Sequence, residues 1–265
     1  MRAIVLTSTM RRHNFVANAV ASSLDVVGLW QEEKSFRPLS FAAVPEDEAI
    51  IGDHFAARDA SEEAFFGDHE RAHCVSRVLS PGACNEPEEI AAMRRADPDV
   101  VLVFGTGLLK APLISAFPGR ILNIHLGLSP YYRGAGTNFW PLVNGEPEYC
   151  GATIHFLDEG VDSGPIIAHV RPVIQSGDGP HDIGNKTIVV AAETLVTAAL
   201  ALDAGGVRGV EQVGRGRVYR RADFSADAVN RLYANFAAGM IDDYLRDQAT
   251  RDRALSLVRM EIEAQ

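Results

Sequence analysis

Asn123 and His125 lie two residues apart in the segment ILNIH, and Asp162 lies further along the chain in the segment DEGVDSG. Side chains alternate along an extended strand, so Asn123 and His125 are predicted to point to the same face. The glycines around Asp162 allow its carboxylate to approach another group closely. An amide, an imidazole and a carboxylate can hold a developing oxyanion, protonate a leaving group and accept a proton. Together they point to acyl transfer without a metal ion.

The same three residues also have a plain structural explanation. Asn123 could complete a turn, His125 could be a buried histidine with a satisfied hydrogen bond, and Asp162 could cap a loop. Residue type and spacing alone do not separate the two explanations. The elements that position these residues, and the motifs around them, must decide.

The N-terminal half has the pattern of an open α/β sheet. A short apolar run spans residues 3–7, apolar residues at helical spacing span 14–24, and a second strand is predicted over 26–30. This order of strand, helix and strand is typical of a doubly wound, Rossmann-like α/β fold with a mostly parallel sheet. From 31 to 77 the pattern weakens, apart from a polar helix predicted over 46–66, and we interpret this stretch as an excursion.

The middle of the chain supplies the strand ends at which a ligand is expected. The apolar run at 100–104 is typical of a strand buried on both faces, and Gly105, Thr106 and Gly107 follow at its C-terminal end. In open α/β sheets, ligands bind beyond such ends. The other predicted elements are helices over 86–95, 112–117 and 183–204 and strands over 120–125, 152–157 and 166–173.

The pattern changes after Ala204, so we predict a catalytic domain over 1–205 and an appendage of hairpin and helix over 206–265. The hairpin is predicted at QVGRGRVYRR, whose arginines could meet substrate phosphates or form a solvated face. These arginines are Arg215, Arg217, Arg220 and Arg221. Ser225 then begins a helical stretch with apolar residues every three or four positions as far as Leu245. Such a stripe is usually core, and it could also form a homodimer contact.

Composition limits the classes of partner. The chain has 265 residues, 47% of them hydrophobic, and a formal net charge of -10. The acidic balance argues against nucleic-acid binding, which needs clustered Lys and Arg. Three cysteines without CxxC spacing predict neither a disulfide framework nor a cysteine zinc site. We expect a cytoplasmic protein, because the N-terminal apolar run is too short for a leader and no run of about 18 apolar residues predicts a membrane span.

Three motifs follow one another in the second half of the chain. They read Asn123-Ile124-His125, then Ser129-Pro130-Tyr131-Tyr132-Arg133-Gly134, then Asp158-Glu159-Gly160-Val161-Asp162-Ser163-Gly164. In this order they resemble the catalytic domain of the folate-dependent formyltransferases. The resemblance implies an enzyme in which Asn123, His125 and Asp162 are catalytic, with Asp162 handling protons and the other two acting on the oxyanion.

The resemblance also implies 10-formyltetrahydrofolate as the cofactor. A pterin has a hydrogen-bonding edge and a flat apolar body, which suits an apolar slot lined by backbone groups. The residues that match the pterin-binding loops of the family are Phe104, Gly105, Thr106, Gly107, Leu108 and Leu109, with Leu157, Asp158, Glu159 and Gly160 opposite. His155 matches a histidine of several family members and is predicted to be a buried support near the site.

The acceptor is less well defined than the cofactor. The resemblance favours a small primary amine, with a nucleotide-linked amino sugar as the first candidate. The turn after the first strand lacks the glycine-rich phosphate loop of the glycinamide ribonucleotide enzymes, so side chains would have to bind an anion there. The residues after Ala204 are too few for the tRNA-binding barrel of the methionyl-tRNA enzymes. The residues predicted to bind the acceptor are Ser8, Thr9, Arg11, Arg12, Tyr132, Arg133 and Gly134.

Other functions remain open at this point. A 10-formyltetrahydrofolate hydrolase would use water at the same site, although such hydrolases carry a regulatory domain that the residues before Asp97 do not match. A formyltransferase acting on glycinamide ribonucleotide would need another way to hold the phosphate. A nicotinamide-dependent oxidoreductase would share the fold, but no GxGxxG follows the first strand. A non-catalytic binding module would not need Asp162.

Overall fold

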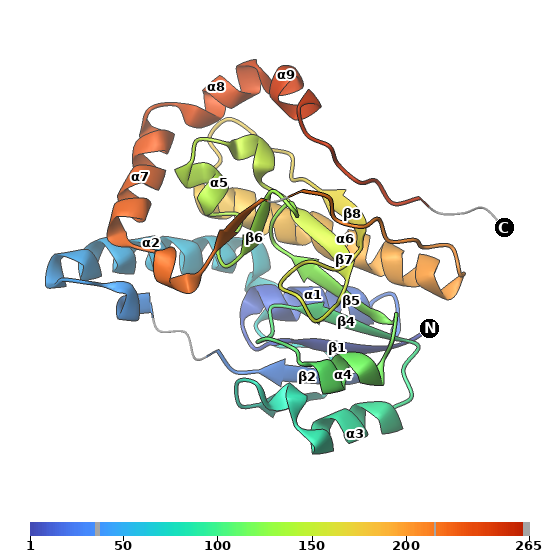
Figure 1. Ribbon diagram of the computed structural model, residues 1–265. Helices are drawn as coiled ribbons and strands as arrows, with labels where there is room; N and C mark the ends of the chain where they lie inside the picture. Colours follow the sequence, from blue (N-terminus) through green and yellow to red (C-terminus); the bar gives the residue numbers. More distant parts are fainter. Residues whose placement is uncertain (35–37, 215, 262–265) are drawn as a thin grey trace.

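The computed structural model describes residues 1–34, 38–214 and 216–261 (Figure 1). A seven-stranded sheet forms its centre, with the strand order β3-β2-β1-β4-β5-β7-β8. Neighbouring strands are parallel from β3 to β5 in this order, whereas β7 is antiparallel to both its neighbours. This confirms the predicted doubly wound sheet. The strands are β1 (Arg2–Ser8), β2 (Asp25–Glu32), β3 (Ser76–Leu79), β4 (Val100–Phe104), β5 (Ile121–His125), β7 (Ala152–Phe156) and β8 (Ile166–Val170).

Helices cover both faces of the sheet, which explains why the central strands are apolar on both sides. All five residues of β4 are buried. On one face, α1 and α6 bury a cluster that includes Val16 and Leu195. On the other face, α3 and α4 bury Met93 and Leu113. The covering helices are α1 (Arg11–Ala21), α3 (Pro87–Arg95), α4 (Ala111–Ala116) and α6 (Pro180–Asp203).

The stretch predicted as an excursion contains two regular elements. α2 (Pro45–Phe66) confirms the predicted helix; it starts with a proline and three acidic residues in its first turn, both favourable at a helix N-terminus. It packs on α1 and α6 and so belongs to the body of the fold. The edge strand β3 was missed, because only four residues pair with β2 and two of them are exposed.

Among the described residues, α6 is the one helix long and apolar enough to cross a membrane. Half of its apolar stretch is buried inside the protein, where it covers the sheet. The core helix of a globular protein passes the same test, so this feature is weak evidence for a membrane span.

The C-terminal helices pack on the rest of the chain. Ser225 caps α7 as predicted, its Oγ accepting the Ala228 N–H at 3.3 Å. Much of the apolar stripe is buried in a cluster with Tyr132 and Trp140, which favours its interpretation as core. The homodimer contact stays a prediction. The C-terminal helices are α7 (Ala226–Ala237), at the left of Figure 1, and α8 (Met240–Arg246) and α9 (Gln248–Arg253), at its top, and α7 packs on α5 (Trp140–Val143).

The predicted hairpin is wrong. β9 (Arg217–Tyr219) pairs in parallel with β6 (Tyr132–Gly134), far away in sequence, instead of with a neighbouring strand. Gly134 permits this close pairing, because a Cβ there would lie 2.2 Å from the carbonyl oxygen of Tyr219. Arg215 lies outside the described residues. The division at residue 205 stays a prediction, and the segments on its two sides share a core.

Candidate active site

The predicted catalytic residues lie where the central strands end. Asn123 and His125 are on β5, and Asp162 is in the loop between β7 and β8. A cavity of about 440 Å³, which we call the strand-end cavity, opens beside all three. Its lining includes Phe104, Gly105, Thr106, Gly107, Leu108, Leu109, Asn123, His125, Gly134, Leu157, Asp158, Gly160 and Asp162.

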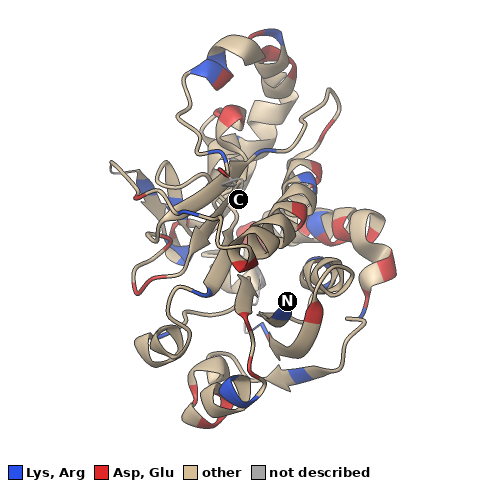
Figure 2. Ribbon diagram, turned by 90° about the vertical axis from the view of Figure 1, so that its right-hand side faces the viewer, with Lys and Arg blue, Asp and Glu red and all other residues tan. Residues whose placement is uncertain are grey.

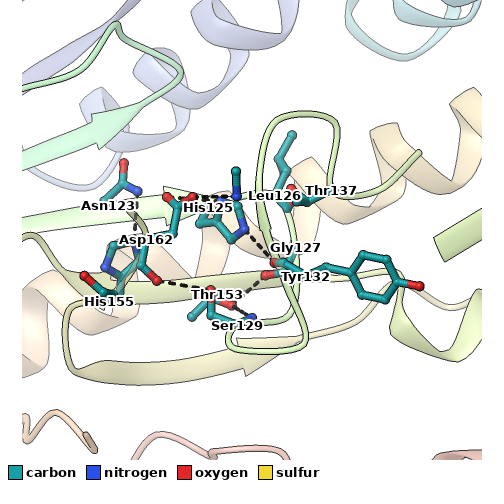
Figure 3. Close-up of polar contacts among 12 residues, drawn as sticks. Asn123, His125, Leu126, Gly127, Ser129, Tyr132, Thr137, Thr153, His155 and Asp162 are labelled. Carbon is teal, nitrogen blue, oxygen red and sulfur yellow. Dashed lines mark hydrogen bonds and ion pairs between the residues drawn. The ribbon is translucent and has the colours of Figure 1, made fainter. Parts of the chain in front are cut away.

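His125 and Asp162 are in direct contact. Nδ1 of the His125 ring lies 3.2 Å from Oδ1 of Asp162 (Figure 3). On the other side of the ring, Nε2 lies 3.0 Å from the carbonyl oxygen of Tyr132. Both ring nitrogens therefore face oxygen acceptors, and a doubly protonated ring can donate to both. This arrangement fixes the ring plane against the carboxylate.

Asp162 is held in a single position by its backbone and its neighbours. It adopts a left-handed conformation with φ of 50°, which is uncommon for residues other than glycine. The Gly134 N–H donates to Oδ2 at 3.1 Å. Burial acts to raise the pKa of the Asp162 carboxyl, but the hydrogen bond and charge of His125 and the Gly134 N–H outweigh it, so the pKa lies below its usual value. The group is a carboxylate able to accept a proton.

His155 holds the side chain of Asn123. Nδ1 of the buried His155 ring lies 2.8 Å from the carbonyl oxygen of Phe156, and Nε2 lies 3.0 Å from Nδ2 of Asn123. Because a carbonyl can only accept, Nδ1 carries the proton and Nε2 accepts from the Asn123 amide. Burial lowers the pKa of His155, although the bond to Phe156 opposes it, which favours this neutral form. The second amide hydrogen of Asn123 is left for another partner.

The residues predicted for the pterin come together around the strand-end cavity. Nine of the ten line it, and only the exposed Glu159 is absent from the lining. Leu108 is 67% exposed, whereas Leu109 and Phe104 are buried in the core clusters. Asp158 accepts hydrogen bonds from the Gly160 N–H at 3.1 Å and from the Ser163 hydroxyl, which keeps its loop folded.

Glu32 and Lys34, which were not predicted as site residues, hold the loop of Gly105 and Gly107 beside this cavity. The buried carboxylate of Glu32, at the end of β2, accepts the Gly107 N–H at 2.8 Å and the Gly82 N–H at 3.0 Å. Lys34 donates to the carbonyl oxygen of Gly105. The sequence showed only an acid at the end of a predicted strand, because the glycine loop that Glu32 binds lies 75 residues further along the chain.

Of the four acceptor residues predicted around the turn after β1, one lines the strand-end cavity. Ser8 is buried and its Oγ has no hydrogen-bond partner among the described residues. Thr9 is exposed and does not line the strand-end cavity. Arg11 pairs with Glu63 at 2.5 Å on the surface. Arg12 pairs with the buried Glu62 and lines the cavity.

The other predicted acceptor residues lie on β6. The Tyr132 phenol points into the core cluster that it forms with Trp140 and the C-terminal helices, and there it donates to Glu146. Only the backbone carbonyl of Tyr132 therefore reaches His125. Gly134 lines the cavity and binds Asp162. Arg133, between them, has a buried Nε without a partner among the described residues. Acceptor binding by these residues stays a prediction.

Comparison with known proteins gives the family. The family described as formyl transferase matches residues 40–199, more than half of the chain. The chain belongs to the formyl transferase family. The matched range contains all three catalytic candidates and the lining of the strand-end cavity apart from Arg12, His13 and Lys34.

Among curated relatives, methionyl-tRNA formyltransferase from Anaeromyxobacter dehalogenans is 30% identical over 172 residues, which cover 64% of this chain and 53% of the relative. The chain thus spans about half the length of the curated relatives it matches. A sugar N-formyltransferase from Shewanella sp FDAARGOS_354 has a TM-score of 0.54 at 16% identity, covering 84% of this chain and 78% of its own. Phosphoribosylglycinamide formyltransferase from Anaplasma phagocytophilum has a TM-score of 0.54 at 17% identity, covering 83% and 98%. These two structures share the fold.

Proposed function

We propose that the protein is an N-formyltransferase that moves a formyl group from 10-formyltetrahydrofolate to the primary amine of a small acceptor. The observation that carries the proposal is the meeting of Asn123, His125 and Asp162 on one cavity wall, although two separate segments supply them. Membership of the formyl transferase family supports the reaction class.

The strand-end cavity suits a folate cofactor. Backbone groups of Gly105, Gly107 and Gly160 line it, and the buried ring of Phe104 gives it an apolar floor. A side chain is not tolerated at Gly105, where φ is 70° and a Cβ would lie 2.3 Å from Nε2 of His13. Exposed backbone groups beside an apolar surface match the edge and the flat body of a pterin.

The bound folate would supply the formyl carbon. The chain would supply the proton transfers and the charge stabilisation. Asp162, directly or through water, accepts the proton that an attacking amine must lose, and the folate nitrogen would take up a proton as its bond to the formyl carbon breaks. The Asn123 N–H that has no partner among the described residues is the first donor for negative charge on the formyl oxygen, and the His125 ring would become a second donor by releasing the Tyr132 carbonyl. Loss of one such donor typically costs about 2.7 to 4 kcal/mol of barrier.

For the acceptor, we propose a nucleotide-linked amino sugar. Arg12 and Lys34 border the strand-end cavity and supply positive charge next to the catalytic residues. The turn after β1 does not supply a glycine-rich phosphate cradle, which is why we place glycinamide ribonucleotide second. A transferred formyl group requires an amine within reach of Asp162, and this requirement defines the test.

The test is to offer 10-formyltetrahydrofolate with a panel of nucleotide amino sugars, amino acids and other amines. We expect tetrahydrofolate to form together with one N-formyl product, identified by its mass. Folate turnover at the same rate without any amine would instead assign a hydrolase. Absence of any folate turnover, with every amine, would contradict both functions.

A further inference from the structure

A second cavity, of about 430 Å³, opens next to the strand-end cavity. We call it the basic aromatic cavity. It shares with its neighbour a wall formed by Arg12, Lys34, Gly105, Gly136 and Phe139. The rest of its lining comes from α2, from the segment after β9, and from Met10, Phe41, Ala135 and Trp140. A ligand in this cavity would therefore end beside the strand-end cavity and its catalytic wall.

The rings of this cavity form one connected cluster. Phe224, just after the short 3₁₀ helix η5 (Arg221–Asp223), lies 5.2 Å from Phe41 and 5.6 Å from Phe55 between ring centroids. It lies 5.1 Å from Phe139 on the shared wall. Flat apolar rings gathered around a cavity of this size offer stacking surfaces for a planar ring.

The charged residues of the lining are all basic. They are Arg12, Lys34, Arg58, Arg220 and Arg221, and the part of the chain that the structure describes contributes no Asp or Glu to the lining. The chain as a whole is acidic, with a net charge of -10, and Asp and Glu are spread over the helices and loops in Figure 2. A cavity without an acid on an acidic protein attracts an anion.

Three of these cations, Lys34, Arg220 and Arg221, form no ion pair with a carboxylate among the described residues. Arg12 is paired with Glu62, and Arg58 pairs with Asp59 at 2.7 Å. Arg221, in contrast, has no ion pair within the described residues, and Lys34 bonds only the Gly105 carbonyl there. Burial, with the charges of Arg12 and Arg221, lowers the pKa of Lys34 to about 8, although the charge of Glu32 opposes this shift. An anion between Lys34 and Arg221 would relieve this repulsion.

We propose that the basic aromatic cavity binds the nucleoside diphosphate part of the acceptor, with the base against the Phe41, Phe55 and Phe224 rings and the phosphates near Lys34 and Arg221. The inference rests on the proposed function for the identity of the acceptor. Guanidinium groups and phosphates form paired hydrogen bonds, and bases stack on aromatic rings, so each half of such a ligand finds a partner. The C-terminal segment, which we predicted to be an appendage, would then form part of the acceptor site.

The test measures binding without a reaction. Uridine and thymidine diphosphates, inorganic pyrophosphate and the free nucleosides are titrated calorimetrically into the full chain near neutral pH. We expect a nucleoside diphosphate to bind more tightly than pyrophosphate or nucleoside alone, and its affinity to fall as the pH rises through about 8. Arg221→Ala and Phe224→Ala should each weaken it about tenfold or more, consistent with about 1–3 kcal/mol for one charged bond or one stacked base.

Matched variants and a second ligand separate the outcomes. Two control variants should leave nucleotide affinity unchanged. They are Arg95→Ala, at an exposed position of α3, and Phe65→Ala, at an exposed position of α2. Binding of 5-formyltetrahydrofolate should survive in all four variants and shows that each is folded. Nucleotide binding that depends on Arg221, without formyl transfer to any sugar, would keep this inference and refute the proposed acceptor. Failure of nucleoside diphosphates to bind, or equal binding by Arg221→Ala, would overturn the inference.

Discussion

The two neighbouring cavities differ in which parts of the chain line them. The strand-end cavity is lined by glycine backbone from loops that follow β4 and β7, whereas the basic aromatic cavity is lined by long side chains from α2 and the C-terminal segment. Backbone groups recognise a ligand by their position, which the fold fixes. Side chains recognise it by their identity, which substitution changes at little cost to the fold. The first cavity therefore suits a constant cofactor and the second a variable acceptor.

Asp162 lines the strand-end cavity but not the basic aromatic cavity, so its removal should separate chemistry from acceptor binding. We expect Asp162→Asn to lower kcat/KM by about a thousandfold, because a positioned general base contributes about 10²–10⁴. Binding of 5-formyltetrahydrofolate and of nucleotide should persist. Asp97→Asn is the control, since Asp97 is the other aspartate with positive φ and lies at the opposite ends of the strands. Activity near wild type in Asp162→Asn would refute the assigned role.

Gly134 lies where the strand-end cavity meets the C-terminal segment. We expect Gly134→Ala to lower activity by at least about tenfold and to destabilise the protein, because its Cβ would clash with the Tyr219 carbonyl and its φ is 89°. Strain of this kind costs about 1–3 kcal/mol. Gly145→Ala is the matched control, with φ of 74° and no atom within 4 Å of the added Cβ. Urea unfolding and turnover should both change more for Gly134→Ala.

Substitution of Glu32 should affect the strand-end cavity more than the basic aromatic cavity. We expect Glu32→Gln to weaken binding of 5-formyltetrahydrofolate about tenfold, since a buried hydrogen bond to a charged group is worth about 1.5–3 kcal/mol. Nucleotide affinity should change much less, because Glu32 does not line the basic aromatic cavity and acts on it only through its charge on Lys34. Glu33→Gln, the exposed neighbour, should change neither affinity. Equal loss of both affinities in Glu32→Gln would show that the two cavities do not act separately.

Two histidines beside the basic aromatic cavity should make the stability of the folded protein fall in acid. Burial and nearby positive groups lower the pKa of His54 to about 3, and burial and Arg58 lower that of His181 to about 4. The unfolded chain thus binds more protons than the folded chain between these values and about 6.5, so stability should fall as the pH drops through this window. Urea midpoints between about pH 7 and pH 5 check this. His181→Gln should flatten the decline, and an unchanged slope would contradict it.

Sequence reasoning succeeded where the pattern was local. The apolar run at 100–104 became β4, and the spacing of Asn123 and His125 put both side chains on one side of β5, in one cavity. Period and strand direction alone require these outcomes. The ten residues predicted for the pterin came instead from the resemblance to the folate-dependent formyltransferases, and nine of them line one cavity because strand ends and the loops that leave them meet at one edge of a parallel sheet.

Sequence reasoning failed where partners are distant along the chain. QVGRGRVYRR has the turn residues of a hairpin, but β9 pairs with β6 because the C-terminal helices bury their apolar stripe against Trp140 and bring β9 there. The Glu32 bond to Gly107 joins the ends of two strands, and no spacing in the sequence reveals it. The basic aromatic cavity likewise needs α2 and Phe224 side by side.

The parallel ribbon of β6 and β9 has one consequence for how this protein could change its substrate. β9 is attached beside Gly134, so the stretch that begins with it and continues through Arg221 and Phe224 enters the acceptor side of the molecule as one contiguous unit. Transplanting that stretch from a related protein would replace specificity groups together while leaving Asn123, His125 and Asp162 untouched. Exchange of this one short piece of the gene would then alter one side of the proposed acceptor cavity while α2 keeps the other side in place.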